Sequence, residues 1–286
     1  MKSLLLPPGE GAAKRRMRGV ALALILIGPL WIYFGPIDEI DATKFHNTTI
    51  VDRNGIVLYE PLSAEGTRGR SIHASQLTEN VVQATIAAED RRFFKHPGID
   101  PIAIARATLH NIRARKVVEG GSTITQQVAK LLLNRQDPQR HRGWGAKIRE
   151  SVIALRLEHR FDKREILAMY LNLAAYGNQI AGAERASRAY FGVPAAQLTH
   201  AQSAFLAGLP QRPTGFNPYR NRPAAISRQR VVLGRMEAGG ALTPAQAAIA
   251  RDEELSFRPS ASPFVAPHFV EMVLASTSER PERIIT

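Results

Sequence analysis

Glu89 and Glu150, in separate segments, are the candidates for acid–base chemistry. Glu89 follows an apolar stretch with helical spacing and precedes an aspartate, two arginines and two phenylalanines. The negative end of a helix dipole and apolar neighbours both raise the pKa of a carboxyl group, which suits a general base. The alternative is a surface carboxylate at a helix end, paired with Arg91 or Arg92.

A glycine-led segment, Gly120 to Thr123, indicates an anion site. It places exposed backbone N–H groups and a serine hydroxyl at the start of a helix, where phosphate binds readily. Gln126, Gln127 and Lys130 follow within the first turns. A plain glycine-led helix cap remains the alternative. The segment is not a nucleotide-binding P-loop, because no Gly-Lys-Ser/Thr closes it.

The second carboxylate, Glu150, lies three residues after Lys147, so the two share one face of a helix. The lysine could hold a leaving pyrophosphate while the glutamate steadies the reacting centre, or the pair could be a solvated ion pair. Two carboxylates beside a basic anion site suggest glycosyl or phosphate chemistry. Metal binding has little support, because the histidines are scattered without ligand spacing.

Local patterns predict the elements that position these residues. Thr48 to Val51 and Ile56 to Tyr59 flank an Asn-Gly turn and predict a small hairpin. Helical spacing that begins at Val81 places Glu89 near a helix end. Asp100 followed by proline predicts the cap and first turn of a helix through Ile112.

Further helices carry the anion site and the second carboxylate. Thr123 and Gln126 form a capping box that opens a helix to about Leu133, and residues 134–145 are polar, basic and expected to be mobile. Lys147 to Phe161 is predicted as one helix. Asp162 with Glu165 caps the next helix.

The first forty residues bear on the compartment. A basic flank precedes an uncharged apolar run from Gly19 to Phe34. With residues 35–37 this run approaches the roughly 17 to 25 residues that span a bilayer. We expect an uncleaved anchor with its basic flank in the cytoplasm and the remaining chain on the other side. A cleaved signal peptide and a buried helix are the alternatives.

The chain has 286 residues, a net charge of +13 and no cysteine, so disulfides and cysteine nucleophiles are excluded. Its positive charge would suit nucleic acid, anionic lipid or a polyanionic substrate. A domain held outside the cytoplasm rarely meets nucleic acid, and no basic recognition helix is present. Lipid and phosphate are therefore the expected partners.

Five motifs in order resemble the glycosyltransferase family 51 domain of class A penicillin-binding proteins and monofunctional peptidoglycan transglycosylases. The similarity covers about Thr48 to Pro218. The motifs are Glu89-Asp90 with Phe94, His96 and Gly98; Gly120 to Gln127; Lys147 to Glu150; Glu165-Ile166-Leu167 with Tyr170-Leu171-Asn172; and Leu209-Pro210-Gln211 with Pro213 and Asn217-Pro218.

The resemblance implies a mainly α, lysozyme-like, two-lobed domain with a small β-hairpin region, one N-terminal transmembrane helix and a groove on the membrane. Its implied location is the bacterial inner membrane, with a single pass and the catalytic domain facing the periplasm or cell exterior. The implied organisation is a cytoplasmic basic tail at 1–18, an anchor at 19–37, the family domain at 45–250 and a linker remnant at 251–286.

The resemblance also implies a reaction. Glu89 matches the general base that deprotonates the acceptor's 4-hydroxyl as this hydroxyl attacks the donor's anomeric carbon. Lipid II and the growing glycan strand are the implied substrates, and undecaprenyl pyrophosphate leaves as a β-1,4 bond forms. Glu150 matches the second essential carboxylate. Some members use a divalent cation, Mg²⁺ or Mn²⁺, at the pyrophosphate, but this sequence offers no clear ligand set. The implied substrate-binding residues are Asp90, Phe94, His96, Ser122, Thr123, Gln126, Gln127, Lys130, Lys147 and Arg149.

Two positions depart from the family pattern. Ala146 stands where an arginine usually precedes the lysine, and Ala175 where a tyrosine is common. The segment from Gly145 to Arg149 and the last residues are similar to the 1C type of penicillin-binding protein, but no Ser-x-x-Lys nucleophile motif follows. A separate transpeptidase or elongation complex is therefore an expected partner. The alternatives are an inactive lipid II-binding or scaffold remnant and a lytic enzyme.

Overall fold

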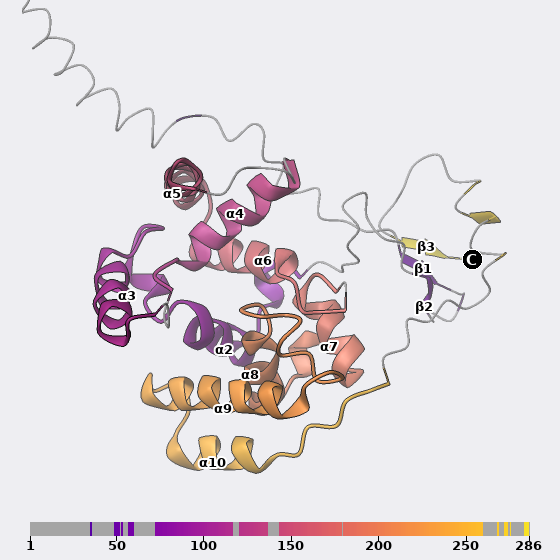
Figure 1. Ribbon diagram of the computed structural model, residues 1–286. Coiled ribbons are helices and arrows are strands. Elements are labelled where there is room, and N and C mark those ends of the chain that lie inside the picture. Colours follow the sequence, from indigo (N-terminus) through magenta and orange to yellow (C-terminus); the bar gives the residue numbers. More distant parts are fainter. Residues whose placement is uncertain are drawn as a thin grey trace, which may run out of the picture.

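The protein is mainly helical, with a small sheet at one side (Figure 1). The computed structural model describes residues 49–51, 57–59, 72–116, 120–136, 143–178, 180–259 and 283–285, together with Gly35, Arg53, His268, Met272, Val273 and Ala275. The helices within these ranges are α2 (Glu79–Glu89), α3 (Pro101–Ala114), α4 (Ile124–Gln136), α5 (Trp144–Arg160), α6 (Lys163–Leu173), α7 (Ala183–Phe191), α8 (His200–Gly208), α9 (Arg222–Ala238) and α10 (Pro244–Asp252). Short 3-10 turns lie at Ala74–Gln76, Phe93–Lys95 and Ala195–Gln197.

Side-chain caps explain where several helices begin. Asp100 accepts hydrogen bonds from the N–H groups of Ile102 and Ala103 and opens α3, as predicted. The predicted capping box of Asp162 and Glu165 is present at the start of α6. Each cap satisfies N–H groups that a helix leaves unpaired in its first turn.

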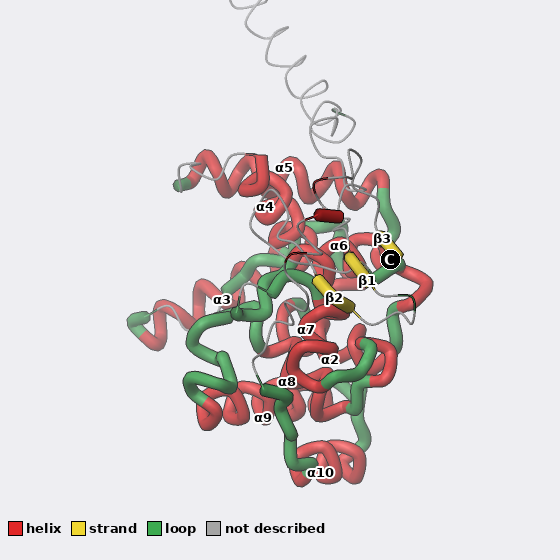
Figure 2. The backbone as a smooth tube through the Cα atoms, turned by 90° about the vertical axis from the view of Figure 1, so that its right-hand side faces the viewer, coloured by secondary structure: helices red, strands yellow, loops and turns green. Residues whose placement is uncertain are grey.

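The helices pack as two connected groups. In one, α4 packs against α5 and α6; in the other, α8 packs against α9 and α2, and α10 against α9. Figures 1 and 2 show α4 and α5 at one side of the molecule and α9 and α10 at the other. Buried residues from both groups form one continuous hydrophobic core, within which Tyr170, Tyr190 and Phe205 are almost fully enclosed.

The predicted hairpin is confirmed. β1 (Thr49–Val51) pairs antiparallel with β2 (Val57–Tyr59), with an irregular register between Ile50 and Val51. The sheet also has a third strand that the sequence analysis did not anticipate. β3 (Arg283–Ile285) pairs parallel with β1, so the order is β2-β1-β3. Strands that are far apart in the sequence therefore meet in one sheet.

Two expectations concern residues that are only partly described. The expected anchor at 19–37 lies outside the described residues except for Gly35. Among the helices that are described, none combines the length and apolar character of a membrane span. Of the segment expected to be mobile, 134–145, the residues up to Gln136 belong to α4 and those from Trp144 belong to α5, while residues 137–142 lie outside the described residues.

Gly177 allows a close turn between α6 and α7. Its φ is +85°, and a Cβ atom there would lie 2.8 Å from the carbonyl oxygen of Pro213. We predict that Gly177→Ala lowers the free energy of unfolding by roughly 2 to 4 kcal/mol, because strain from positive φ adds to the clash. Urea unfolding followed by circular dichroism measures this loss.

Gly234 provides the matched control. It lies inside α9, and a Cβ there would meet no described atom within 4 Å. Gly234→Ala should therefore raise the free energy of unfolding by about 0.5 to 1 kcal/mol, since alanine favours a helix. Equal effects of the two substitutions would contradict this account of Gly177.

Candidate active site

Glu89 is the last residue of α2 and is partly buried. Its Oε2 accepts a hydrogen bond of 2.8 Å from Nε2 of Gln127 on α4. Burial raises the pKa of the Glu89 carboxyl above its ordinary value, while Gln127 and the charges of Arg228 and Arg235 partly oppose this rise. The raised pKa expected from the sequence is confirmed, and desolvation is its largest cause.

The alternative pairing of Glu89 with Arg92 is wrong. Nε of Arg92 lies 2.9 Å from Oδ2 of Asp100, the residue that caps α3. The ion pair of Arg92 with Asp100 stabilises the turn between α2 and α3. The amide of Gln127, not Arg92, therefore binds the carboxylate of Glu89, and a pair with Arg91 stays an alternative.

Asp90 and His96 brace the site from within the protein. Both side chains are buried, and His96 Nε2 lies 3.0 Å from Asp90 Oδ2. The same carboxylate oxygen accepts a hydrogen bond of 3.1 Å from the N–H of Ile124, the first residue of α4. Asp90 thus joins the end of α2 to the start of α4. Phe94, in contrast, leaves about half of its surface exposed.

One cluster of the described residues has the spacing of a metal site: Asp90, His96 and Asp100 can each offer an atom within 4.8 Å of the others. The carboxylate oxygens of the two aspartates already accept bonds from backbone N–H groups, and Asp100 also binds Arg92. All three side chains are buried. These donors leave little capacity for a divalent cation, so the cluster does not fit the implied metal.

The glycine-led segment caps the start of α4 and packs closely against α3. Thr123 and Gln126 form the predicted capping contacts: Thr123 Oγ1 accepts from the N–H of Gln126, and Gln126 Oε1 accepts from the N–H of Thr123. Gln126 is buried and also donates to Ser151 Oγ on α5. A Cβ on Gly121 would lie 3.0 Å from Cα of Ile104 on α3, so glycine permits close packing there.

Lys147 connects the glycine-led segment to the second carboxylate. Its Nζ lies 2.9 Å from Ser122 Oγ and 3.2 Å from Glu150 Oε2. The Glu150 side chain keeps only 10% of its surface exposed, so the pair is not the fully solvated one considered as the alternative. Lys147 retains 44% exposure, which leaves its ammonium group accessible to an anion. Lys130 and Arg149 are exposed.

The predicted residues therefore form two contact sets at the start of α4. Gln127 contacts Glu89, whereas Ser122 contacts Lys147, which in turn contacts Glu150.

Two arginines of α9 were not predicted. Arg235 Nη1 and Arg228 Nη2 lie 2.9 Å and 3.5 Å from the carbonyl oxygen of Ala88, next to Glu89. No local pattern in the sequence distinguishes them from other arginines.

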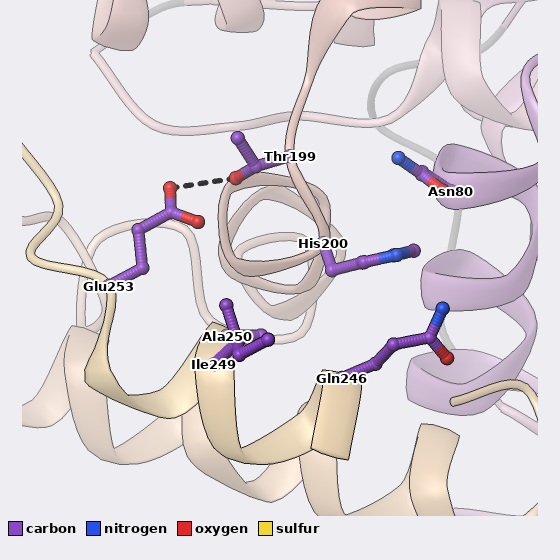
Figure 3. Close-up of a pocket in the computed structure, with 7 residues that line it drawn as sticks. All are labelled: Asn80, Thr199, His200, Gln246, Ile249, Ala250 and Glu253. Carbon is purple, nitrogen blue, oxygen red and sulfur yellow. Dashed lines mark hydrogen bonds between the residues drawn. The ribbon is translucent and has the colours of Figure 1, made fainter. Parts of the chain in front are cut away.

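A pocket of about 270 Å³ lies elsewhere, between the starts of α2 and α8 and one face of α10 (Figure 3). Asn80, which lines it, is separated from Glu89 by about 14 Å along the axis of α2. None of the predicted site residues lines this pocket. Its lining residues are Asn80, Thr199, His200, Gln246, Ile249, Ala250 and Glu253.

Comparison with known proteins identifies relatives of this chain. A biosynthetic peptidoglycan transglycosylase from Nitrosospira multiformis is 36% identical over 72% of this chain and 84% of its own length. Penicillin-binding protein 1C from Escherichia coli is 35% identical over 85% of this chain and 30% of its own length. Penicillin-binding protein 1A from Aquifex aeolicus is 38% identical over 71% of this chain and 27% of its own length. The chain thus spans less than a third of either penicillin-binding protein.

A crystal structure of penicillin-binding protein 1A from Haemophilus influenzae aligns with a TM-score of 0.45 and 18% identity, over 84% of this chain and 27% of that chain. The Transglycosylase family model matches residues 56–237, which include Glu89, the glycine-led segment, Lys147 and Glu150. This match covers more than half of the sequence. With the carboxylates and the basic cluster in place, the chain belongs to the transglycosylase family.

Proposed function

We propose that this protein is a peptidoglycan glycosyltransferase, which polymerises lipid II into β-1,4-linked glycan strands and releases undecaprenyl pyrophosphate. The observation that carries the proposal is the placement of Glu89, whose raised pKa suits a base and whose Oε2 is held by Gln127. A base of this kind can take the proton from a sugar hydroxyl as that hydroxyl attacks an anomeric carbon.

The second contact set supplies the complementary chemistry. As the donor's anomeric carbon is attacked, negative charge develops on the departing pyrophosphate. The ammonium group of Lys147, held between Ser122 and Glu150, is positioned to stabilise that charge. Glu150 in turn keeps Lys147 oriented. Lys130 and Arg149 add exposed positive charge, and Ala146 supplies none where an arginine is common in the family.

The exposed surface supports a reaction at a membrane. Ile102, Ile104, Leu109 and Ile112 of α3 are each at least 42% exposed, and Trp144 of α5 is 88% exposed. Apolar side chains of this kind on a basic protein suit contact with lipid. We place the family domain at 45–250, with each helix group forming one of its two lobes. Residues 19–37 would form an anchor in the inner membrane. A separate transpeptidase would be the partner.

The experiment that tests the proposal is polymerisation of purified lipid II by the full chain in detergent. Wild type should make glycan chains, and Glu89→Gln should reduce the rate at least 100-fold, because the amide keeps the shape but cannot take a proton. Intact lipid II with wild type across a range of pH and divalent cations would overturn the proposal. Tight binding of lipid II without turnover would favour the inactive remnant. Release of soluble fragments from purified sacculi would favour a lytic enzyme.

Lys147→Met should lower the rate of polymerisation roughly 100-fold, because the developing charge on pyrophosphate loses the ammonium group that Ser122 and Glu150 hold. Lys116→Met is the matched control, since Lys116 is exposed and belongs to neither contact set of the site. The rate is measured with labelled lipid II at saturating concentration. A similar loss in both variants would point to general electrostatic attraction rather than to a specific role of Lys147.

The raised pKa of Glu89 also predicts a stability effect. Its folded-state carboxyl holds a proton more tightly than the unfolded chain does, so ionisation opposes folding. The cost is absent below the ordinary value of 4.5, grows as pH rises to the folded pKa, and is constant above it. Glu89→Gln should therefore have a higher Tm than wild type at pH 7 and an equal Tm near pH 4. Equal Tm values at both would contradict the raised pKa.

A further inference from the structure

Three buried polar atoms near the candidate base lack a hydrogen-bond partner among the described residues. They are Glu89 Oε1, Tyr170 Oη and Arg228 Nε. The three residues come from α2, α6 and α9, which are distant in sequence. A single buried polar atom without a partner is costly, and three in one region require a common explanation.

Contacts and charges place these groups together. Arg228 donates from Nη2 to the carbonyl oxygen of Ala88, the residue before Glu89. The charge of Glu89 raises the pKa of Tyr170 and the charge of Arg228 lowers it, and burial, the largest cause, keeps the phenol well above its usual range. Tyr170 is thus a neutral hydroxyl donor within electrostatic range of both other groups.

Packing holds Arg228 in place. A Cβ on Gly208 of α8 would lie 2.9 Å from Cγ of Arg228, so the glycine makes room for the arginine stem. Arg235 shares the same carbonyl oxygen of Ala88 at 2.9 Å. The guanidinium of Arg228 is therefore fixed against the end of α2 rather than free to move into solvent.

One water molecule could form a hydrogen bond with each of the three atoms, because together they offer both donors and acceptors. Arg228 Nε can only donate, Glu89 Oε1 accepts when ionised, and Tyr170 Oη can donate or accept. A buried water commonly makes about three hydrogen bonds to buried polar groups that lack other partners. We propose that Tyr170 and Arg228 are positioning residues for Glu89, joined to its Oε1 through one buried water. This inference rests on the proposed role of Glu89 as base.

The arrangement would hold both oxygens of the base. Gln127 binds Oε2 from α4, while the water would bind Oε1 from the side of α6 and α9. The carboxylate then keeps one orientation, and its charged form is stabilised by donors to both of its oxygens. Two further groups shift the pKa of Glu89, namely Asp90 directly after α2 and Arg235 on α9, and the charge of Glu89 in turn raises the pKa of Tyr176 after α6.

Tyr170→Phe tests the inference, because it removes one hydroxyl and little volume. Loss of this donor destabilises ionised Glu89, so the acid limb of kcat/KM against pH for lipid II polymerisation should move upward by about one pH unit. Arg228→Gln should move the limb in the same direction, and Arg228→Lys, which restores the charge, should move it less. An unchanged limb in Tyr170→Phe would overturn the inference.

Tyr190→Phe is the matched control. Tyr190 is also a buried tyrosine, but its hydroxyl donates to the carbonyl oxygen of Tyr176 at 2.7 Å. Its loss should lower Tm without moving the acid limb. If both tyrosine variants lower Tm and move the acid limb by the same amount, Tyr170 has only a structural role and the inference fails.

A second measurement does not depend on activity. The difference in Tm between Glu89→Gln and its parent grows with pH and stops growing near the pKa of folded Glu89. In the Tyr170→Phe background this endpoint should lie at higher pH than in wild type. An equal endpoint would overturn the inference even if lipid II is polymerised. A shifted endpoint without polymerisation would support the positioning contact and reject the proposed function.

Discussion

The relative placement of the reacting groups depends on the buried carboxylate of Asp90. It follows Glu89 directly, and its bond to the N–H of Ile124 attaches the end of α2 to the start of α4. His96 supports the same carboxylate. Because Gln127 and Ser122 lie on either side of Ile124 in the chain, this one attachment sets the position of Glu89 relative to both contact sets. A buried charge that lost these partners would be costly, so the joint has few alternative arrangements.

The site balances opposing electrostatic demands. Burial makes Glu89 a stronger base, but burial without compensation would leave it protonated and useless at neutral pH. Arginines on α9 and the amide of Gln127 oppose that effect. At Lys147 the balance is different: the lysine remains accessible while its partner Glu150 is largely enclosed. In the proposed reaction, one carboxylate would take the proton and the other would orient a cation.

Features that depend on neighbouring residues were predictable from the sequence. The caps at Asp100, Thr123 and Asp162 are local, because each side chain satisfies N–H groups two or three residues away. The different roles of Gln126 and Gln127 were not predictable. Adjacent helical residues point about 100° apart, so one meets Ser151 and the other Glu89, and only the packing partner decides which. The contacts of Arg228 and Arg235 with Ala88 link segments that are distant in the sequence. No periodic pattern of residues in the sequence marks such contacts.

The parallel pairing of β3 with β1 has a kinetic consequence. A two-stranded hairpin is at best marginally stable in water, so β1 and β2 gain their third partner only after residues 283–285 have been synthesised. During synthesis at roughly 5 to 20 residues per second, β3 follows β1 by more than about ten seconds. The helical core, whose contacts are mostly made by residues up to α10, can therefore form before the third strand joins the sheet.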